Sequence, residues 1–144
     1  MVAPESFVED AWGFKDYTSI TAGTLSYDLA ARGLEPTTRS RILGRNRDLV
    51  LTNLEILKSW IATHNGLFTL TPPDSAAMAF VKYHFDMPST ELTDLLHKQK
   101  SVLVVPGAHF GLENFLRVGY GLETLKLKAA LVRIDEAIKE LNVA

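Results

Sequence analysis

The sequence predicts an α+β domain in which a small mixed or antiparallel sheet packs on helices and follows one long helix. Three observations lead to this prediction. Apolar residues recur at helical spacing in both ends of the chain. Short runs of strand formers, separated by Pro, Gly and polar turn residues, fill the middle. The resulting order of helix, strand, strand, helix, strand, strand and helix is typical of a small sheet with helices on one side.

Composition narrows the class of protein. A chain of 144 residues fits one domain, and 47% hydrophobic with 22% charged residues is ordinary for a soluble globular protein. The net charge of −2 provides no broad attraction to nucleic acid or to anionic membrane. The chain has no cysteine, no apolar run long enough to span a bilayer and no secretory signal pattern. We therefore expect a cytoplasmic protein with neither a nucleic-acid nor a membrane partner.

The first helices are short. Residues 4–17 and residues 24–33 each carry apolar side chains at helical spacing. A segment rich in Thr, Ser and Gly lies around their junction and includes Tyr17, Thr18 and Ser19. These hydroxyl groups have two interpretations at this point: they serve turns and helix caps, or they contact a ligand.

The longest predicted helix begins after Pro36 and stops near Asn65-Gly66. Thr37 or Thr38 is the expected cap. Its polar face holds the arginines Arg39, Arg41, Arg45 and Arg47. We interpret this face as solvated; a phosphate or nucleic-acid site is the alternative, but no aromatic platform accompanies the arginines.

The remaining elements alternate between strand and helix. The first two strands are predicted at 68–71 and 77–85, and a helix capped by Ser89 or Thr90 follows. The stretch S-V-L-V-V-P-G (101–107) predicts a third strand, and 110–121 predicts a fourth. A C-terminal amphipathic helix is marked by Leu127, Leu131, Ile134, Ile138 and Leu141.

Most enzyme motifs are absent from the sequence. It contains no Gly-rich phosphate loop, no HExxH metal pair and no G-x-S-x-G nucleophile elbow. The four histidines are widely separated, and the acidic residues form no evident pair. We therefore assign no metal ligand and no catalytic residue.

Arg117 is the unusual residue of the fourth predicted strand, F-L-R-V-G-Y-G (115–121). An unpaired buried guanidinium would be costly because it stays charged. Three explanations are open: Arg117 faces water on an edge strand, pairs with a carboxylate such as Glu113, or binds an anionic ligand. Glycines at 107 and 111 would allow a ligand to approach the preceding loop closely.

Several quoted segments together resemble one known family. They are A-W-G-F-K-D-Y-T-S-I-T-A-G-T-L-S, R-S-R-I-L-G-R-N-R-D-L-V-L-T-N-L-E-I-L-K-S-W-I, F-T-L-T-P-P-D-S-A-A-M-A-F-V-K-Y and S-V-L-V-V-P-G-A-H-F-G-L-E-N-F-L-R-V-G-Y-G. In order and spacing they resemble the C-terminal part of a class I/II aminotransferase, the fold-type I family that depends on pyridoxal phosphate. The most specific piece is V-P-G, then F-G, then F-L-R-x-G-Y-G.

The resemblance implies a function for Arg117. In the family the arginine of this motif binds the α-carboxylate of the substrate through a two-pronged pair, and this fixes the substrate against the cofactor. It also implies that Tyr17, Thr18 and Ser19 approach the cofactor site of the neighbouring subunit. The implied cofactor is pyridoxal phosphate, and the implied reaction moves an amino group between an amino acid and a 2-oxo acid.

The resemblance also implies a division of the chain. Residues 1–35 would be trailing helices of the large domain, 36–66 the linking helix and 67–144 the small domain. The family's Schiff-base lysine lies upstream of the region matched, and neither Lys15 nor Lys58 lies in a matching motif. We therefore expect a truncated aminotransferase segment that does not bind the cofactor covalently and is not catalytic alone.

Two alternatives to a truncated aminotransferase segment stay open at this point. The chain could be a non-catalytic binding or assembly module derived from the small domain, or one half of a split enzyme. Its expected partner is a second copy of itself, as a dimer, or a separate large domain. Apolar residues such as Phe7, Trp12 and Leu25 would otherwise remain exposed.

Overall fold

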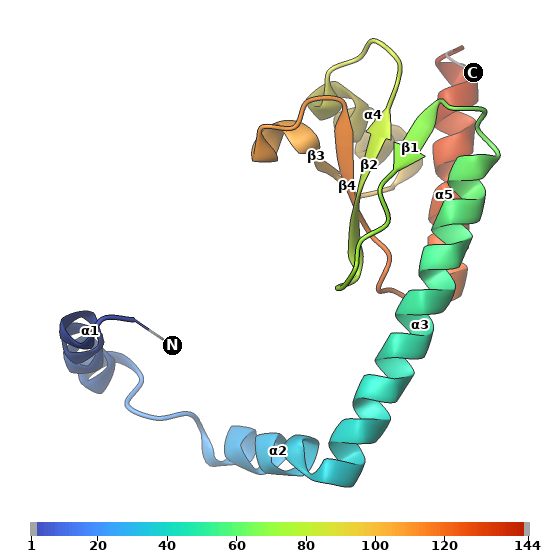
Figure 1. Ribbon diagram of the computed structural model, residues 1–144. Coiled ribbons are helices and arrows are strands. Elements are labelled where there is room, and N and C mark those ends of the chain that lie inside the picture. Colours follow the sequence, from blue (N-terminus) through green and yellow to red (C-terminus); the bar gives the residue numbers. More distant parts are fainter. Residues whose placement is uncertain (1–2, 143–144) are drawn as a thin grey trace. The chain divides into compact units, whose positions relative to one another are not determined.

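The computed structural model describes residues 3–142 and divides the chain into two compact units, residues 1–43 and 44–144. Its elements, labelled in Figure 1, are α1 (Glu5–Thr18), α2 (Thr24–Leu34), α3 (Pro36–Ala62), β1 (Phe68–Leu70), β2 (Met78–Tyr83), α4 (Ser89–Lys100), β3 (Val105–Pro106), the 3-10 helix η1 (Gly107–Phe110), β4 (Phe115–Gly119) and α5 (Thr124–Glu140). Within the described range, no helix is long and apolar enough to cross a membrane.

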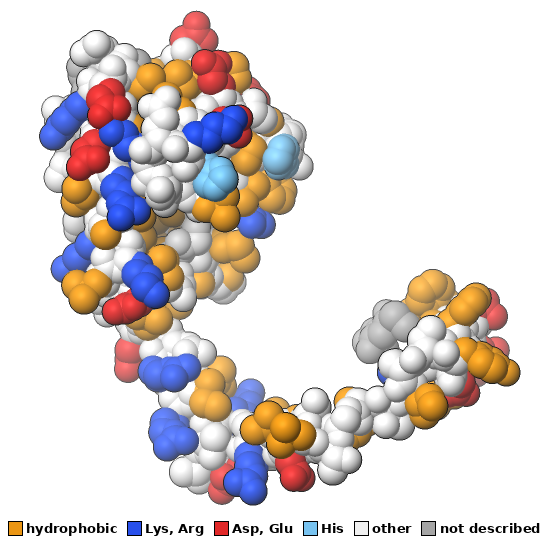
Figure 2. All heavy atoms as spheres, turned by 180° about the vertical axis from the view of Figure 1, so that it is seen from behind, with side chains coloured by type: hydrophobic (Ala, Val, Ile, Leu, Met, Phe, Trp, Pro, Cys, Tyr) orange, Lys and Arg blue, Asp and Glu red, His pale blue; other side chains and the backbone are white. Residues whose placement is uncertain are grey.

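The first unit has helices, but none of its described residues, 3–43, is buried. No residue of α1 or α2 is buried. Figure 2 shows hydrophobic side chains on the surface of this helical region. The large apolar side chains exposed on it are Phe7, Val8, Trp12, Phe14, Tyr17, Ile20, Leu25, Tyr27, Leu29, Leu34, Ile42 and Leu43. Two short amphipathic helices cannot cover this area by themselves.

Helix α3 begins before either of the threonines expected to cap it. Pro36 is its first residue, a position that suits proline because no intrahelical partner awaits its missing N–H. The prediction that Thr37 or Thr38 caps the helix is therefore wrong; Thr38 instead donates a 2.9 Å hydrogen bond to the Glu35 carboxylate. After Ala62 the chain turns through Asn65 and Gly66, whose φ angles of 47° and 87° are left-handed.

The sheet is antiparallel throughout, with strand order β1-β2-β4-β3. The central pair aligns Phe80 with Arg117 and Val81 with Leu116. This architecture confirms the predicted α+β class. The third strand is only two residues long, because Ser101 leaves α4 in a left-handed conformation and the next N–H, of Val102, still bonds to Leu96 O at 3.0 Å.

One face of the sheet forms the core of the second unit. Along β2 and β4 the alternate residues Val81, Leu116 and Val118 are each at most 8% exposed. They pack with Leu57 of α3 and with apolar residues of α4 and α5, which cover this side of the sheet (Figure 1). The members of the core on the three helices are Leu57, Leu92, Leu96, Leu127, Leu131, Ile134, Ala137 and Ile138.

The N-terminus of helix α4 is capped by a side chain from a later part of the chain. Ser89 is its first residue, so the prediction that Ser89 or Thr90 caps it is wrong. The Ser89 backbone N–H donates a 2.5 Å hydrogen bond to Oε1 of Glu113 instead. A carboxylate at a helix N-terminus is also favoured by the helix dipole.

Candidate functional site

Arg117 lies on the sheet face opposite the core. Its neighbours along β4, Leu116 and Val118, point into the core, and strand alternation places Arg117 on the other side, where it is partly exposed. Phe80 of β2 and Val105 of β3 are its cross-strand partners. Within residues 3–142 the guanidinium has neither a salt bridge nor a hydrogen bond to a side chain. Strand β4, which pairs with β2 and β3, thus holds the guanidinium on the outer face of the sheet. Its N–H donors are available to a ligand there.

The guanidinium of Arg117 lies over an aromatic ring. The Cζ of Arg117 lies 5.3 Å from the centroid of the Phe110 ring, in cation–π geometry. The Phe80 ring meets Phe110 edge to face at a centroid distance of 5.3 Å. Phe110 was not predicted as a site residue, although it is the Phe of the F-G pair in the motif quoted above. This contact leaves the N–H donors of Arg117 available.

The loop before β4 is built around Gly107. A Cβ added there would lie 2.1 Å from Leu112 O and 2.7 Å from Phe115 Cβ, so the backbone can approach only because Gly107 has no side chain. The buried Ser89 accepts a 3.1 Å hydrogen bond from Ala108 N in the same loop. These contacts fix η1, and with it Phe110, against the start of α4.

Glu113 does not pair with Arg117. Its carboxylate accepts hydrogen bonds from the backbone N–H groups of Ser89 and Asn114, at 2.5 and 3.3 Å. The hydrogen bond from Ser89 is the main reason that the pKa of Glu113 lies below its ordinary value. Glu113 therefore serves the junction of α4 and the loop, and one of the three explanations for Arg117 is removed.

Tyr17, Thr18 and Ser19 lie at the end of α1, in the first unit. The Thr18 hydroxyl donates to Phe14 O at 3.0 Å, and the Ser19 hydroxyl accepts from Lys15 Nζ at 3.2 Å. Tyr17 is 94% exposed. The hydroxyls of Thr18 and Ser19 thus make local contacts at a helix end, whereas the Tyr17 ring is free to meet a partner.

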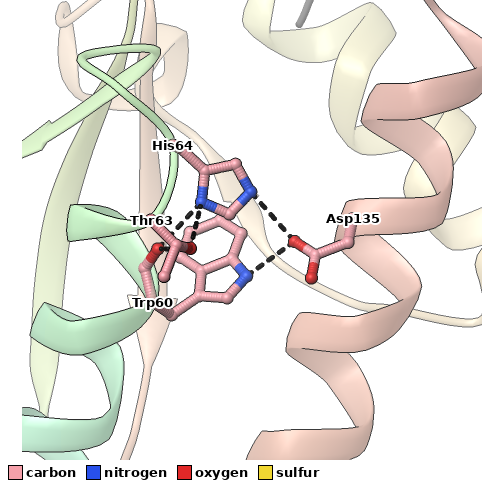
Figure 3. A network of polar contacts seen from close by, with 4 residues as sticks. All are labelled: Trp60, Thr63, His64 and Asp135. Atoms are coloured by element: carbon pink, nitrogen blue, oxygen red, sulfur yellow. Dashed lines mark hydrogen bonds and ion pairs between the residues drawn. The ribbon is translucent and has the colours of Figure 1, made fainter.

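A second polar cluster joins α3 and α5 (Figure 3). Asp135 Oδ1 accepts hydrogen bonds from Trp60 Nε1 at 2.7 Å and from His64 Nε2 at 3.0 Å. His64 Nδ1 lies 2.8 Å from Trp60 O, and the Thr63 hydroxyl donates to the same carbonyl at 2.7 Å. Because Trp60, Thr63, His64 and Asp135 direct these polar contacts at one another, we interpret the cluster as structural. The described residues contain no group of three or more acidic or histidine side chains that could hold a metal.

The arrangement around Arg117 is suited to binding a carboxylate. A guanidinium with free N–H donors can form two parallel hydrogen bonds to a planar carboxylate. Apolar neighbours such as Phe110 and Phe80 reduce the water around it and strengthen such a pair. An arrangement of this kind is chemically suited to binding and orienting an anion, and none of the described side chains named around Arg117 is placed to transfer a proton.

Known proteins are similar to this chain over most of its length. The chain matches the family described as Aminotransferase class I and II over residues 8–134. It is 27% identical over 142 residues to capreomycidine synthase of Streptomyces vinaceus and 28% identical over 150 residues to aromatic-amino-acid aminotransferase 2 of Thermococcus litoralis. It covers 35% and 36% of the lengths of these two proteins, whereas 95% and 97% of the chain is matched.

Solved structures have the same fold. The crystal structure of a PLP-dependent aminotransferase from Streptococcus suis superposes with a TM-score of 0.85 at 28% identity, covering 99% of this chain and 37% of that one. The aromatic aminotransferase from Pyrococcus horikoshii superposes with a TM-score of 0.81 at 21% identity and 99% coverage of this chain. This chain spans about a third of the length of such relatives and belongs to the aminotransferase class I and II family, the fold-type I enzymes that use pyridoxal phosphate.

Proposed function

We propose that this chain provides the substrate-carboxylate site of a PLP-dependent aminotransferase, with Arg117 as the residue that binds the α-carboxylate of an amino acid or 2-oxo acid. The proposal is carried by one observation. Arg117 lies on the open face of the sheet, and no acidic side chain of the described residues lies within ion-pair distance of it. A carboxylate would supply the missing counter-charge.

The side chain would act by orientation. Two hydrogen bonds from one guanidinium fix both the position and the plane of a carboxylate. This restricts the rotation of the atom next to the carboxylate, which is the reacting carbon in amino-group transfer. Pyridoxal phosphate, when bound in the complete enzyme, supplies the electron sink for that transfer.

The described residues of this chain do not fit the cofactor by themselves. Lys58 is paired with Glu55 at 2.8 Å on an exposed helix face, and Lys15 donates to the exposed Ser19 hydroxyl. Lys82, which strand alternation places on the same face of the sheet as Arg117, lies with its Nζ 5.9 Å from the centroid of the Phe115 ring. None of these environments is an enclosed pocket with a partner for the pyridine nitrogen. Borohydride reduction of a mixture of chain and cofactor should therefore trap no stoichiometric adduct at a single lysine.

Titration with a carboxylate tests the function of Arg117. Pyruvate added to the ¹⁵N-labelled chain should shift the Nε–Hε resonance of Arg117 in a saturable manner. Arg117→Gln should abolish the saturable response. The matched control is Arg133→Gln on the exposed face of α5, which should retain it. A response that survives in Arg117→Gln, or is absent in the unmodified chain, rejects the proposal.

The partner proposal concerns the first unit. We propose that a second copy of the chain covers the exposed apolar side chains of α1 and α2. In the complete enzyme, Tyr17, Thr18 and Ser19 would then face the cofactor site of the neighbouring subunit. Trp12 and Phe14 are 61% and 76% exposed, which favours burial at an interface. Sedimentation should show a dimer at tens of micromolar, and Trp12→Glu should shift it to monomer. The control is Leu103→Glu, which is 80% exposed on the second unit and should not shift it.

A further inference from the structure

We infer that Phe110 is a positioning residue for Arg117: its ring holds the guanidinium ready for a carboxylate without neutralising it. The inference rests on the proposed function of Arg117 and adds a residue to that site. It starts from three side chains on three elements. Phe80 on β2 meets Phe110 on η1 edge to face, and Phe110 in turn lies under the guanidinium on β4.

Core packing does not explain the position of the Phe110 ring. The residue is 47% exposed, so its ring is not needed to fill the core. The contacts that place the ring come instead from the backbone of its own loop. Gly107 permits the close approach of that loop to Leu112 and Phe115, and Ser89 binds the Ala108 N–H. The backbone contacts of the loop therefore fix the position of the Phe110 ring, and the guanidinium of Arg117 lies over the face of this ring.

A ring is a suitable support for an arginine that must bind an anion. The face of an aromatic ring attracts a cation but accepts no strong hydrogen bond and carries no net charge. An internal carboxylate such as Glu113 would instead occupy the N–H donors of the guanidinium and neutralise its charge. Glu113 does not do so, because its carboxylate accepts a hydrogen bond from the Ser89 N–H. The guanidinium thus loses conformational freedom before ligand arrives, which lowers the entropic cost of binding.

The test compares substitutions that remove or keep the ring. Phe110→Leu removes the ring, Phe110→Tyr keeps it, and Leu112→Ala removes exposed apolar area from the same loop without touching the ring. In the unmodified chain the Arg117 Nε–Hε resonance should be displaced upfield by the ring current. Phe110→Leu should abolish the displacement and increase side-chain motion, whereas Phe110→Tyr and Leu112→Ala should not.

Pyruvate affinity supplies the second readout. Loss of a cation–π contact at a partly exposed site should weaken pyruvate binding in Phe110→Leu by about two- to fivefold. Phe110→Tyr should restore the affinity, and all variants should melt at nearly the same temperature because Phe110 lies outside the core.

The outcomes separate this inference from the proposed function. If pyruvate binds equally well to the unmodified chain and to Phe110→Leu, the positioning inference is wrong and the function of Arg117 stands. If the ring-current displacement disappears in Phe110→Leu but pyruvate never shifts Arg117, the ring does position the side chain and the proposed function is wrong. If Phe110→Leu melts far below Leu112→Ala, the ring is a packing element and the inference is wrong.

Discussion

The indole Nε1 of Trp60 donates a 2.7 Å hydrogen bond to the carboxylate of Asp135, and this contact joins α3 to α5. The same carboxylate oxygen also accepts from His64 (Figure 3). Two donors separated by one helical turn thus converge on one acceptor, more than seventy positions away in the sequence. These contacts join α3 to α5 within the second unit.

Removal of the shared acceptor should destabilise the second unit. Asp135→Ala leaves the donors of Trp60 and His64 partly buried and unpaired, so the free energy of unfolding should fall by about 2 kcal/mol. Urea denaturation followed by tryptophan fluorescence measures this change. Asp94→Ala is the control, because the Asp94–Lys98 pair is exposed on both sides and should contribute less than about 0.5 kcal/mol. Equal effects of the two substitutions would contradict a stabilising role for the contacts of Asp135 with Trp60 and His64.

Asn53 should be more sensitive than any surface asparagine. It is completely buried, and its Nδ2 donates to Tyr120 O at 2.8 Å and to Leu122 O at 2.7 Å. Its Oδ1 accepts from the Thr124 hydroxyl at 2.8 Å. Asn53→Leu should lower the free energy of unfolding by about 3 kcal/mol because three polar groups lose their partner. The same substitution at the exposed Asn46 should change it by less than about 0.5 kcal/mol, and a similar loss at both sites would refute the assignment.

Gly107 should tolerate no side chain. Gly107→Ala places a Cβ 2.1 Å from the Leu112 carbonyl oxygen, so the loop must move, and the unfolding free energy should fall by about 1–3 kcal/mol. Displacement of η1 should also weaken the effect of Phe110 on the Arg117 resonance. Gly44→Ala is the opposite case: Gly44 lies in α3 with no atom within 4 Å of the added Cβ, and the substitution should stabilise by about 0.5–1 kcal/mol.

Alkaline stability should depend on Tyr83. Burial, and secondarily the charge of Glu113, raises the pKa of Tyr83 from 10.0 to about 12. Between pH 10 and 12 the unfolded chain releases the phenolic proton that the folded chain keeps, so the unfolded state binds fewer protons and stability falls as pH rises. The contribution is complete below pH 10 and is lost towards pH 12.

Comparison of two tyrosine substitutions measures this effect. Tyr83→Phe should flatten the fall of unfolding free energy above pH 10, and Tyr27→Phe, at an exposed position, should leave it unchanged. The free energy of unfolding of Tyr83→Phe should still fall somewhat as the pH rises, because burial raises the pKa of Tyr120 as well. If both variants lose stability with the same slope as the unmodified chain, Tyr83 is not the group that titrates.

The parts of the fold that depend on local sequence were predictable. Helix positions follow from apolar spacing, and the direction in which Arg117 points follows from strand alternation, because both periods act over a few residues. The short β3 was not predictable in the same way. Residues 101–104 are strong strand formers, but they leave the sheet because the left-handed turn at Ser101 ties Val102 back to α4.

The contacts that depend on pairing between distant segments were missed. Glu113 was a reasonable partner for Arg117 by proximity in the sequence, yet it binds the Ser89 N–H, 24 positions away. The Trp60–Asp135 contact leaves no local pattern, because any residue on the facing side of α5 could have met Trp60. Phe110 was also missed: its place in the F-G pair of the motif is the signal that could have selected it, but only the structure puts its ring under Arg117.

The central claim is that Arg117 is open and binds carboxylates, and arginine-specific modification tests it most directly. The chain is treated with phenylglyoxal with and without pyruvate, and the modified fraction of each arginine is read by mass spectrometry. Arg45 and Arg133, both exposed, serve as internal controls in the same sample. The account predicts that Arg117 reacts in the free chain and that pyruvate slows modification at Arg117 alone. Failure of Arg117 to react, or equal protection of all three arginines, would contradict it.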